Sequence, residues 1–274
     1  GSEADLEVGT AIEVIGRDAF LPNPVTSTDL LNNLIASTRR AAIGVTRSSD
    51  IAIRGISIGL GQDGQRFGVG ATTGISLDEV SRVDVLRGAG EAFFGPNRIA
   101  GCVTALSVRD SRDVVIQDNI VGGGEFGDWR LKNRLALWLQ GVQNSRIEGN
   151  NLAFNRRGIL IEGEGFGTRV IQNFLWDDYD YGMFARDTAS GYRLGEFNAR
   201  NVFGAGNGSV MALEGNGTVQ SEYNEYGTQG RPMLLGSRVT TRPPPTVELG
   251  ELGLTISGFN AQSFDRIVVA SSDA

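Results

Sequence analysis

The sequence predicts an all-β protein, a right-handed single-stranded parallel β-helix in which successive turns of chain stack as a solenoid. Residues 145–187 contain two copies of one unit, with Ile147 over Val170 and Asn150 over Asn173. Each copy is a short strand, an Asn turn, a second short strand, a loop and a third strand. A unit of this length cannot bury its apolar face alone, so stacking of neighbouring units must supply the core.

The third strand of the unit recurs along the chain with steps of 22 to 31 residues. Its copies end at Asp78, Arg109, Gln140, Glu162, Arg186 and Glu214. Alternation along each copy predicts that Ile161 lies inside, between Leu139 and Ala185, and that Glu162 and Arg186 share the outer surface. Short strands rich in branched apolar residues suit a parallel sheet. We therefore expect roughly eight to ten rungs.

Asparagines fall at one turn position of three successive rungs. Asn119, Asn150 and Asn173 are spaced by the same repeat as the strands. Asn tolerates the left-handed turn conformation, and stacked Asn side chains can hydrogen-bond from one rung to the next. We expect a structural ladder here rather than a binding site.

The ends of the chain are less regular than its middle. We expect an N-terminal cap at 1–41, in which 28–37 has the apolar spacing of a helix, because an open solenoid end exposes unpaired strands. The β-helix is expected over 42–239. Three consecutive prolines at 243–245 interrupt the pattern, and 240–274 is expected to form a closing rung or cap.

Composition excludes several classes of function. The formal net charge of −7 argues against nucleic-acid binding. The chain has no histidine, which removes His-based catalytic triads and His metal sites. Cys102 is the only cysteine, so no intrachain disulfide can form, and we expect a buried, unreactive thiol.

The repeats over 105–187 resemble the parallel β-helix repeat proteins of the pectate-lyase-like superfamily. The resemblance is carried by ALSVRDSRDVVIQDNIV, LALWLQGVQNSRIEGNNL and GILIEGEGFGTRVIQNFL, and weaker copies extend it over roughly 40–225. It implies the fold, an extracellular, periplasmic or cell-surface location, and a link to polysaccharides. Members include lyases, hydrolases and epimerases as well as non-catalytic surface proteins, so the resemblance does not fix a reaction.

A second, local resemblance covers residues 51–103. IAIRGISIGLGQDGQ and LDEVSRVDVLRGAGEAFFGPNRIAGCV are similar to the plug domain of TonB-dependent outer-membrane receptors, although Ala89 replaces the usual proline. No β-barrel pattern follows, and the same residues also fit two solenoid rungs. We expect one continuous β-helix, with a plug-like first domain that ends near residue 105 as the alternative.

Long loops are expected to carry any binding function. The segments 59–73, 91–104 and 122–135 leave what look like corresponding corners, so we expect them to lie side by side on one face. Aromatic rings, arginines and carboxylates together suit sugar recognition, because rings stack on pyranoses and charges take hydroxyls or uronate carboxylates. The expected substrate-binding residues are Trp129, Arg130, Trp176, Arg98, Arg157 and Tyr181.

The acidic segment 177–180 is the candidate catalytic centre. Adjacent carboxylates repel, so one can act as acid and another as base, as glycoside hydrolysis requires. A lyase or epimerase would need a base and a neutralising arginine. The candidate catalytic residues are Asp177, Asp178, Asp180, Tyr179 and Arg156. A solvated acidic turn and a calcium site are the alternatives, calcium being the only cofactor this segment suggests.

One outward row contains Trp138, Leu160 and Phe184 in successive rungs. An apolar row of this kind indicates a homo-oligomer interface or a surface covered by 240–270. Three functions therefore remain open. The first is polysaccharide binding, with or without lyase, epimerase or glycoside hydrolase activity. The second is a non-catalytic assembly protein that oligomerises through this row, and the third is a receptor plug-like module.

Overall fold

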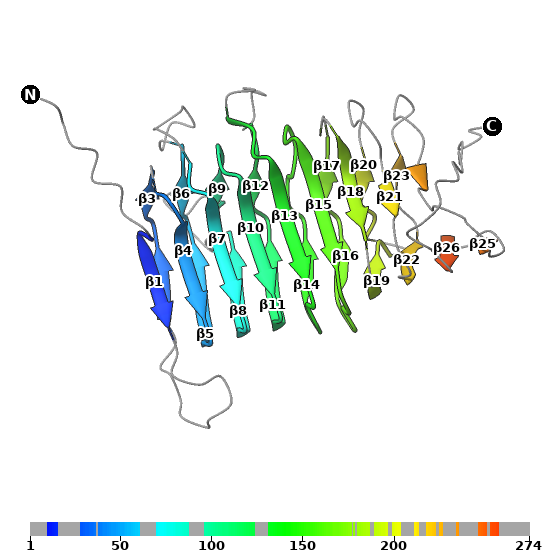
Figure 1. The fold of residues 1–274 in the computed structure, drawn as a ribbon, viewed down its shortest axis with the longest axis horizontal. Helices are drawn as coiled ribbons and strands as arrows, with labels where there is room; N and C mark the ends of the chain where they lie inside the picture. The colour runs from blue at the N-terminus through cyan, green and yellow to red at the C-terminus, as the bar shows by residue number, and fades with distance from the viewer. Residues whose placement is uncertain are drawn as a thin grey trace, which may run out of the picture.

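The structure is a computed structural model of the chain. It describes residues 10–15, 28–36, 38–60, 70–87, 96–123, 131–176, 178, 180–186, 189–196 and 199–203, together with the backbone of strands at 211–213, 218–222, 225–226, 234–235, 246–250 and 253–257. These residues form strands and turns stacked into a parallel β-helix (Figure 1). The described part has no helix long and apolar enough to span a membrane.

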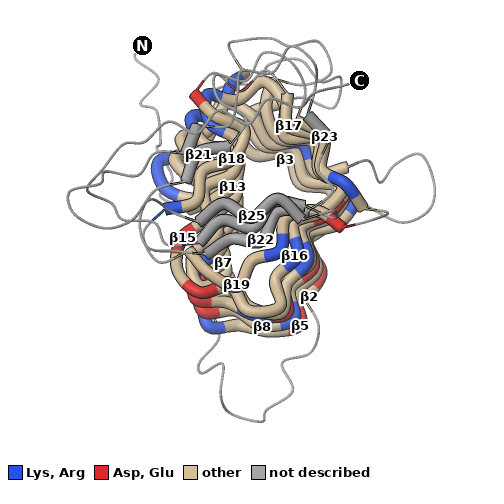
Figure 2. The backbone as a smooth tube through the Cα atoms, turned by 90° about the vertical axis from the view of Figure 1, so that its right-hand side faces the viewer, with Lys and Arg blue, Asp and Glu red and all other residues tan. Residues whose placement is uncertain are grey.

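Three sheets run the length of the stack, and successive rungs overlie one another when viewed along it (Figure 2). In the described part, sheet A has nine strands, one for each rung. They are β1 (Ile12–Ile15), β4 (Ala41–Thr46), β7 (Thr73–Asp78), β10 (Thr104–Arg109), β13 (Leu135–Gln140), β15 (Arg157–Glu162), β18 (Tyr181–Ala185), β21 (Met211–Leu213) and β24 (Leu234–Leu235).

Sheet B lies beside sheet A and is parallel except at its C-terminal end. It contains β2 (Thr28–Leu31), β5 (Ser49–Arg54), β8 (Ser81–Leu86), β11 (Arg112–Gln117), β14 (Arg146–Glu148), β16 (Arg169–Ile171), β19 (Ser190–Leu194), β22 (Thr218–Glu222), β26 (Gly253–Ser257) and β25 (Thr246–Gly250). The hairpin of β25 and β26 pairs antiparallel on β22. Strands from 246 to 257 therefore extend sheet B.

Sheet C consists of two-residue strands. They are β3 (Leu34–Ile35), β6 (Ser57–Ile58), β9 (Arg98–Ile99), β12 (Ile120–Val121), β17 (Phe174–Leu175), β20 (Val202–Phe203) and β23 (Glu225–Tyr226). Asn151 bridges Ile120 and Phe174 and so joins the two parts of this sheet.

The register confirms the predicted stacking of the repeats. Ile161 pairs with Leu139 on one side and Ala185 on the other, and all three are at most 3% exposed. Glu162 forms an ion pair with Arg186 on the outer face of sheet A, where the Glu162 side chain is 8% exposed and that of Arg186 is 44% exposed. Because inward residues of every rung meet those of the next, one apolar core extends from β3 to β20.

The corners of the stack use left-handed backbone in vertical columns. Between sheets A and B, one column holds Arg47, Glu79, Asp110, Gly141 and Gly163, all with φ between 46° and 68°. The amide of each of the first four donates to a carbonyl oxygen of the next rung, over 2.8 to 3.1 Å. A similar column between sheets B and C includes Gly149, with φ of 63°, where a Cβ would lie 2.4 Å from Asp118 Oδ1, so a larger residue would be strained and would displace that side chain.

Two ladders of buried side chains, all of them amides except the carboxylate of Asp178, brace the corners at either end of sheet C. The first is the predicted ladder, extended at both ends to Asn97, Asn119, Asn150, Asn173 and Asn201, with Nδ2 to Oδ1 distances of 2.7 to 3.1 Å. The second ladder is Asn133, Asn155 and Asp178. Both also hold backbone groups that would otherwise be buried without a partner.

Two sequence-based expectations are wrong. Residues 28–35 form β2 and β3 rather than a helix, and Asn32, with φ of 52°, turns the chain between them. The three long loops do not leave one corner. Residues 61–69 and 124–130 connect sheet C to sheet A, whereas 88–95 connects β8 of sheet B to β9 of sheet C.

Candidate functional site

The structure gathers several predicted site residues at the corner where sheet C turns into sheet A. The turns that lead into β15 and β18 bring together Phe154, Arg156, Arg157, Trp176, Asp180 and Tyr181. We call these six residues the corner site. The two turns are held together by Phe154 N–H donating to Trp176 O and Asp180 N–H donating to Arg156 O, over 2.8 and 2.7 Å.

A single carboxylate oxygen organises the charged half of the corner site. Asp180 Oδ2 accepts hydrogen bonds from Nε of Arg156 at 3.1 Å and from Nε of Arg157 at 2.9 Å. The hydrogen bond to Asp180 raises the pKa of Arg157. Two cations share one anion, so the cluster carries a net positive charge.

Tyr181 lies beneath these charges. The Arg157 guanidinium is 5.7 Å from the centroid of its ring. Burial raises the pKa of the Tyr181 phenol. The phenol therefore stays protonated at neutral pH and is suited to donate a hydrogen bond rather than to act as a base.

The aromatic half of the corner site centres on Trp176, whose residue is 42% exposed. Phe174 packs edge-on against its ring at a centroid distance of 5.6 Å, and Phe154 lies at 6.1 Å. Both phenylalanines are half-buried, and Phe174 is anchored in β17. The indole is thus held in a fixed orientation with part of its surface in solvent.

Asp178 has a different environment from Asp180. It is fully buried, and its Oδ1 accepts a hydrogen bond from Asn155 N–H at 2.9 Å. It follows Asn155 in the described part of the second ladder, where it accepts this hydrogen bond from the rung before. Asp178 is therefore placed in the wall of the solenoid and away from the solvent-facing charges of the corner site.

Four other predicted residues, Asp177, Tyr179, Trp129 and Arg130, lie outside the described residues. Arg98 is described and half-buried on β9. The outward column of sheet C runs from Arg98 through Ile120 and Asn151 to Phe174. Three strand spacings put Arg98 about 14 Å from Phe174, on the same face as the aromatic half of the corner site.

Surface carboxylates are few in the described part of the corner site. Among the residues that the structure describes, the corner offers one surface carboxylate, Asp180, and it is already shared by two arginines. Glycoside hydrolysis requires two carboxyl groups that both reach the substrate. The described residues also contain no group of three or more Asp, Glu, Cys or His placed to hold a metal ion. Calcium at 177–180 stays a prediction, since Asp177 is outside the described part.

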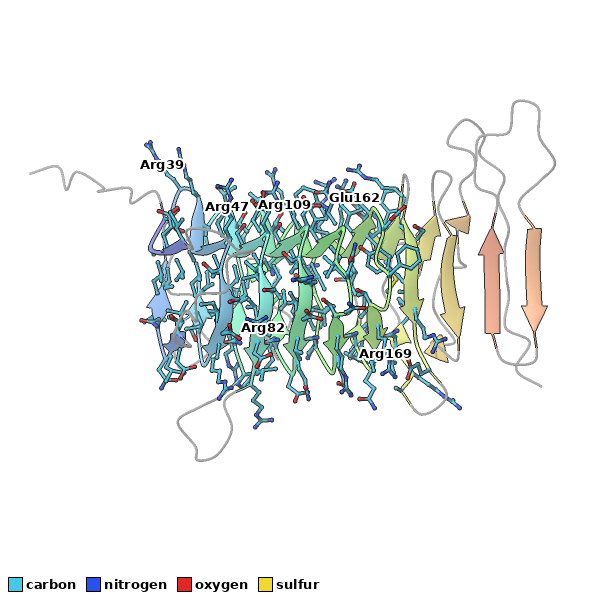
Figure 3. All side chains as sticks on the ribbon, turned by 90° about the horizontal axis from the view of Figure 1, so that it is seen from below. Arg39, Arg47, Arg82, Arg109, Glu162 and Arg169 are labelled. Carbon is cyan, nitrogen blue, oxygen red and sulfur yellow. The ribbon has the colours of Figure 1, made fainter. Side chains whose placement is uncertain are left out.

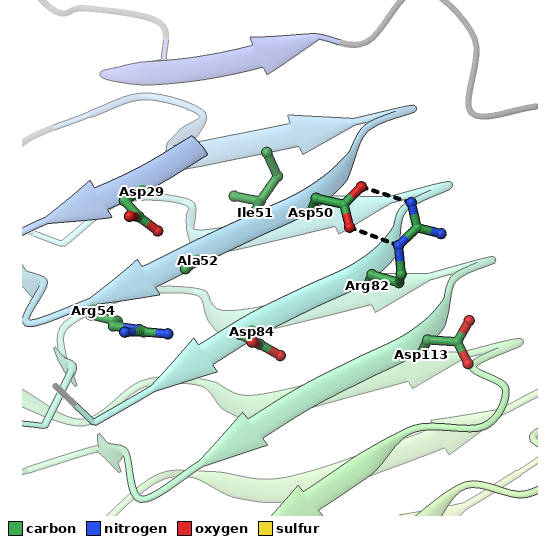
Figure 4. A pocket seen from close by; sticks show the side chains of 8 residues that line it. All are labelled: Asp29, Asp50, Ile51, Ala52, Arg54, Arg82, Asp84 and Asp113. Atoms are coloured by element: carbon green, nitrogen blue, oxygen red, sulfur yellow. Dashed lines mark hydrogen bonds and ion pairs between the residues drawn. The ribbon is translucent and has the colours of Figure 1, made fainter. Parts of the chain in front are cut away.

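A second surface feature was missed by the sequence analysis. A shallow hollow of about 460 Å³ on the outer face of sheet B is lined by Asp29, Asp50, Ile51, Ala52, Arg54, Arg82, Asp84 and Asp113 (Figure 4). The repeat pattern of the sequence could have predicted this hollow. Asp29, Ala52 and Asp84 occupy one outward position in three successive rungs, and the small alanine leaves space between the two carboxylates.

One wall of this hollow is a paired ion bridge. Arg82 donates from Nε to Asp50 Oδ1 and from a terminal nitrogen to Oδ2, both at 2.7 Å. These hydrogen bonds lower the pKa of Asp50 to about 2. Asp29 and Asp84 have no ion pair with another described residue. The hollow is thus a mixed-charge surface with an acidic excess.

Comparison with known proteins gives one family match. Residues 4–102 match the family model described as TonB-dependent Receptor Plug Domain. This confirms the local resemblance seen in 51–103. The described residues within this match lie in the first rungs of the β-helix, and β7 and β8 continue in register into β10 and β11. No curated protein matches the chain.

Two solved structures are similar to the chain at low identity. One is PfbA, a surface adhesin of Streptococcus pneumoniae, with 9% identity, a TM-score of 0.28, and coverage of 83% of this chain and 70% of that chain. The other is QnrB1, a plasmid-mediated fluoroquinolone resistance protein, with 10% identity, a TM-score of 0.19, and coverage of 76% and 82%. At these TM-scores neither bears on fold or function.

Proposed function

We propose that this chain is an extracytoplasmic β-helix that binds a polysaccharide at the corner site without cleaving it. The observation that carries the proposal is the partly exposed Trp176, held by Phe174 and Phe154 beside the positively charged cluster of Arg156, Arg157 and Asp180. A fixed indole next to hydrogen-bonding charges is what a protein offers to a pyranose ring.

Each part of the corner site has a task in this proposal. The indole of Trp176 stacks on the apolar face of one sugar. Arg156 and Arg157 point toward solvent from the same turn, with exposed side chains that can take hydroxyl groups or a uronate carboxylate. Asn151 and Arg98, along the outward column of sheet C, would meet the next sugars of an extended chain.

The extracytoplasmic location rests on two resemblances. TonB-dependent receptors, whose plug family matches residues 4–102, are outer-membrane proteins. The repeats over 105–187 resemble pectate-lyase-like proteins, which act on polysaccharides outside the cytoplasm. Both support a periplasmic or cell-surface setting.

The test is binding to a panel of neutral and uronate-containing polysaccharides by affinity electrophoresis and calorimetry. Trp176→Ala should weaken binding at least about tenfold, because it removes ring stacking and buried contact area. Phe166→Ala is the matched control, since Phe166 is also an exposed aromatic at 61% but lies in the turn between β15 and β16. Equal loss, or no loss, in both variants would refute the corner site.

A second variant separates charge from stacking. Asp180→Asn leaves Arg156 and Arg157 without their shared anion. Binding of a polyuronate should then tighten while binding of a neutral glycan changes little. Weaker binding of both glycans would instead indicate that Asp180 itself contacts the sugar.

A plug-like module is the second candidate, favoured by the family match to residues 4–102. It predicts that this region unfolds separately from the rest, so limited proteolysis followed by mass spectrometry should show early cleavage near residue 105. Cleavage near residue 105 that begins only when the whole chain unfolds would contradict the plug-like candidate.

A further inference from the structure

The outer face of sheet A carries rows of side chains in consecutive rungs. The charged row is Asp78, Arg109, Gln140, Glu162 and Arg186. The apolar row beside it runs from Ser76 and Ser107 to Trp138, Leu160 and Phe184. Arg109 and Glu162 project from the same side of the stack (Figure 3).

The signs along the charged row are reversed about its centre. Starting from one end, the row reads negative, positive, neutral, negative, positive. Gln140 on β13 is the midpoint. Turning the row end for end therefore places every charge opposite one of the other sign: Asp78 meets the position of Arg186, and Arg109 meets the position of Glu162.

The apolar row is held rigidly in place. Trp138 donates from Nε1 to Glu162 Oε2 at 2.7 Å, and the Arg109 guanidinium lies 5.9 Å from its ring centroid. Leu160 is 9% exposed, and both aromatic neighbours in the row are half-buried. The Phe184 ring packs against Tyr181 at 5.0 Å. A fixed apolar surface flanked by charges has the composition of a protein interface core and rim.

The C-terminal strands do not account for this face. The segment 240–270 was one of two sequence-based alternatives for the apolar row, as its cover. Within that segment, β25 (Thr246–Gly250) and β26 (Gly253–Ser257) form a hairpin that extends sheet B beyond β22. An intramolecular cover by these strands is therefore excluded.

We propose that the outer face of sheet A binds a second copy of the same chain, related by a twofold axis that runs along β13. This axis keeps the strand direction and reverses the order of the rungs. Trp138 and Gln140 of the two copies then meet at the axis. Asp78 faces Arg186 of the second copy and Arg109 faces Glu162, twice each by symmetry.

The intramolecular ion pairs remain in this arrangement. Arg109 stays bonded to Asp78 at 3.0 Å, and Arg186 stays paired with Glu162. Each pair meets an opposite pair, so four charges alternate in sign around each of two clusters. Five strands of about six residues, β7, β10, β13, β15 and β18, give a face of roughly 480 Å² per copy, or about 950 Å² in total, which is the size of a weak or transient interface. A dimer of micromolar affinity is expected.

The alternative twofold axis, along the solenoid, is electrostatically poorer. It would place Asp78 and Arg109 opposite Thr73 and Thr104 of the second copy, on the far edge of the same strands. Their charges would gain no partner there. The axis along β13 is the one that uses the whole charged row.

Paired charge swaps test the proposal, because they keep each intramolecular ion pair while reversing it. The first variant combines Asp78→Arg with Arg109→Asp, and the second combines Glu162→Arg with Arg186→Glu. In either homodimer all four facing pairs become like-charged, whereas a mixture of the two variants restores opposite charges at every facing position. Thermal melting of each variant checks that the fold is intact.

Sedimentation velocity over about 1 to 200 µM is the measurement. The unaltered chain should dimerise, each variant alone should dimerise at least about 100-fold more weakly, and the equimolar mixture should dimerise again. A monomeric unaltered chain would overturn the proposal, as would a first variant that dimerises unchanged. If the second variant does not fold, the first variant still decides the matter.

Discussion

Replacing Asn150 by alanine should destabilise the β-helix more than any comparable change at its surface. Asn150 is 1% exposed and lies in the middle of the first ladder. Its Oδ1 accepts from the N–H and the Nδ2 of Asn119 at 3.1 and 2.9 Å. Its Nδ2 donates to Ile116 O and to Asn173 Oδ1, both at 2.9 Å.

Alanine removes all four hydrogen bonds and leaves the Asn119 N–H buried without its acceptor. A net hydrogen bond contributes about 1 kcal/mol, and an unsatisfied buried group costs about 1–3 kcal/mol. We therefore expect a loss of about 3–5 kcal/mol in the free energy of unfolding. The adjacent Asn151→Ala is the matched control, because Asn151 is half-buried on the outer face and makes one side-chain hydrogen bond, to Ala153 N–H at 3.3 Å.

Urea unfolding followed by circular dichroism measures the difference, with the control expected within about 1 kcal/mol of the unaltered chain. Amide hydrogen exchange gives a local readout, since the Asn119 amide should exchange faster by two orders of magnitude or more in the ladder variant alone. Similar stability of the two variants, or an unchanged Asn119 amide, would refute the role assigned to the ladder.

Three further predictions follow from other parts of the structure. Gly158→Ala should destabilise the fold by several kcal/mol, because the new Cβ would lie 2.0 Å from a carbonyl oxygen of the next rung. Gly44→Ala is the control and should be nearly neutral, because no atom lies closer than 3.6 Å to its Cβ position. Thermal melting compares the two variants. Burial raises the pKa of Cys102 to about 12, so its thiol should react with a disulfide reagent only after unfolding, and rapid native labelling would contradict this. The hydrogen bonds from Arg82 are the main cause of the lowered pKa of Asp50, about 2. The ionised Asp50 therefore stabilises the fold above pH about 4, and this contribution is lost as the pH falls toward 2. In Arg82→Gln, the urea midpoint should depend less on pH over that range.

The sequence was sufficient to predict the stacking of the central rungs. Alternation and the Asn repeat determine which side chains face inward, and the register of Leu139, Ile161 and Ala185 follows from them. The first rung was misassigned because Leu30, Leu31, Leu34 and Ile35 have a helical spacing. A strand, a turn and a second strand generate the same spacing when Asn32 adopts left-handed backbone between them.

The corner site and the loop positions were predicted only in part, and two ladder residues show why. Asp178 looks like its acidic neighbours, and only the position of Asn155 beneath it shows that it belongs to a ladder. The loop over 88–95 was assigned to the wrong corner because Asn97 was not recognised as a ladder member. The spacing Asn97 to Ile99, which equals that of Asn119 to Val121, contained that signal.

The left-handed corners and the amide ladders fix each rung independently of how much chain lies between two strands. Fourteen residues, 59–72, separate β6 from β7, yet Thr73 pairs with Thr104 and Ala41 as if the connection were short. Foreign peptides inserted at this corner should therefore be displayed at a spacing set by the strand separation of about 4.8 Å. The protein could serve as a scaffold that holds several grafted epitopes at chosen multiples of that distance.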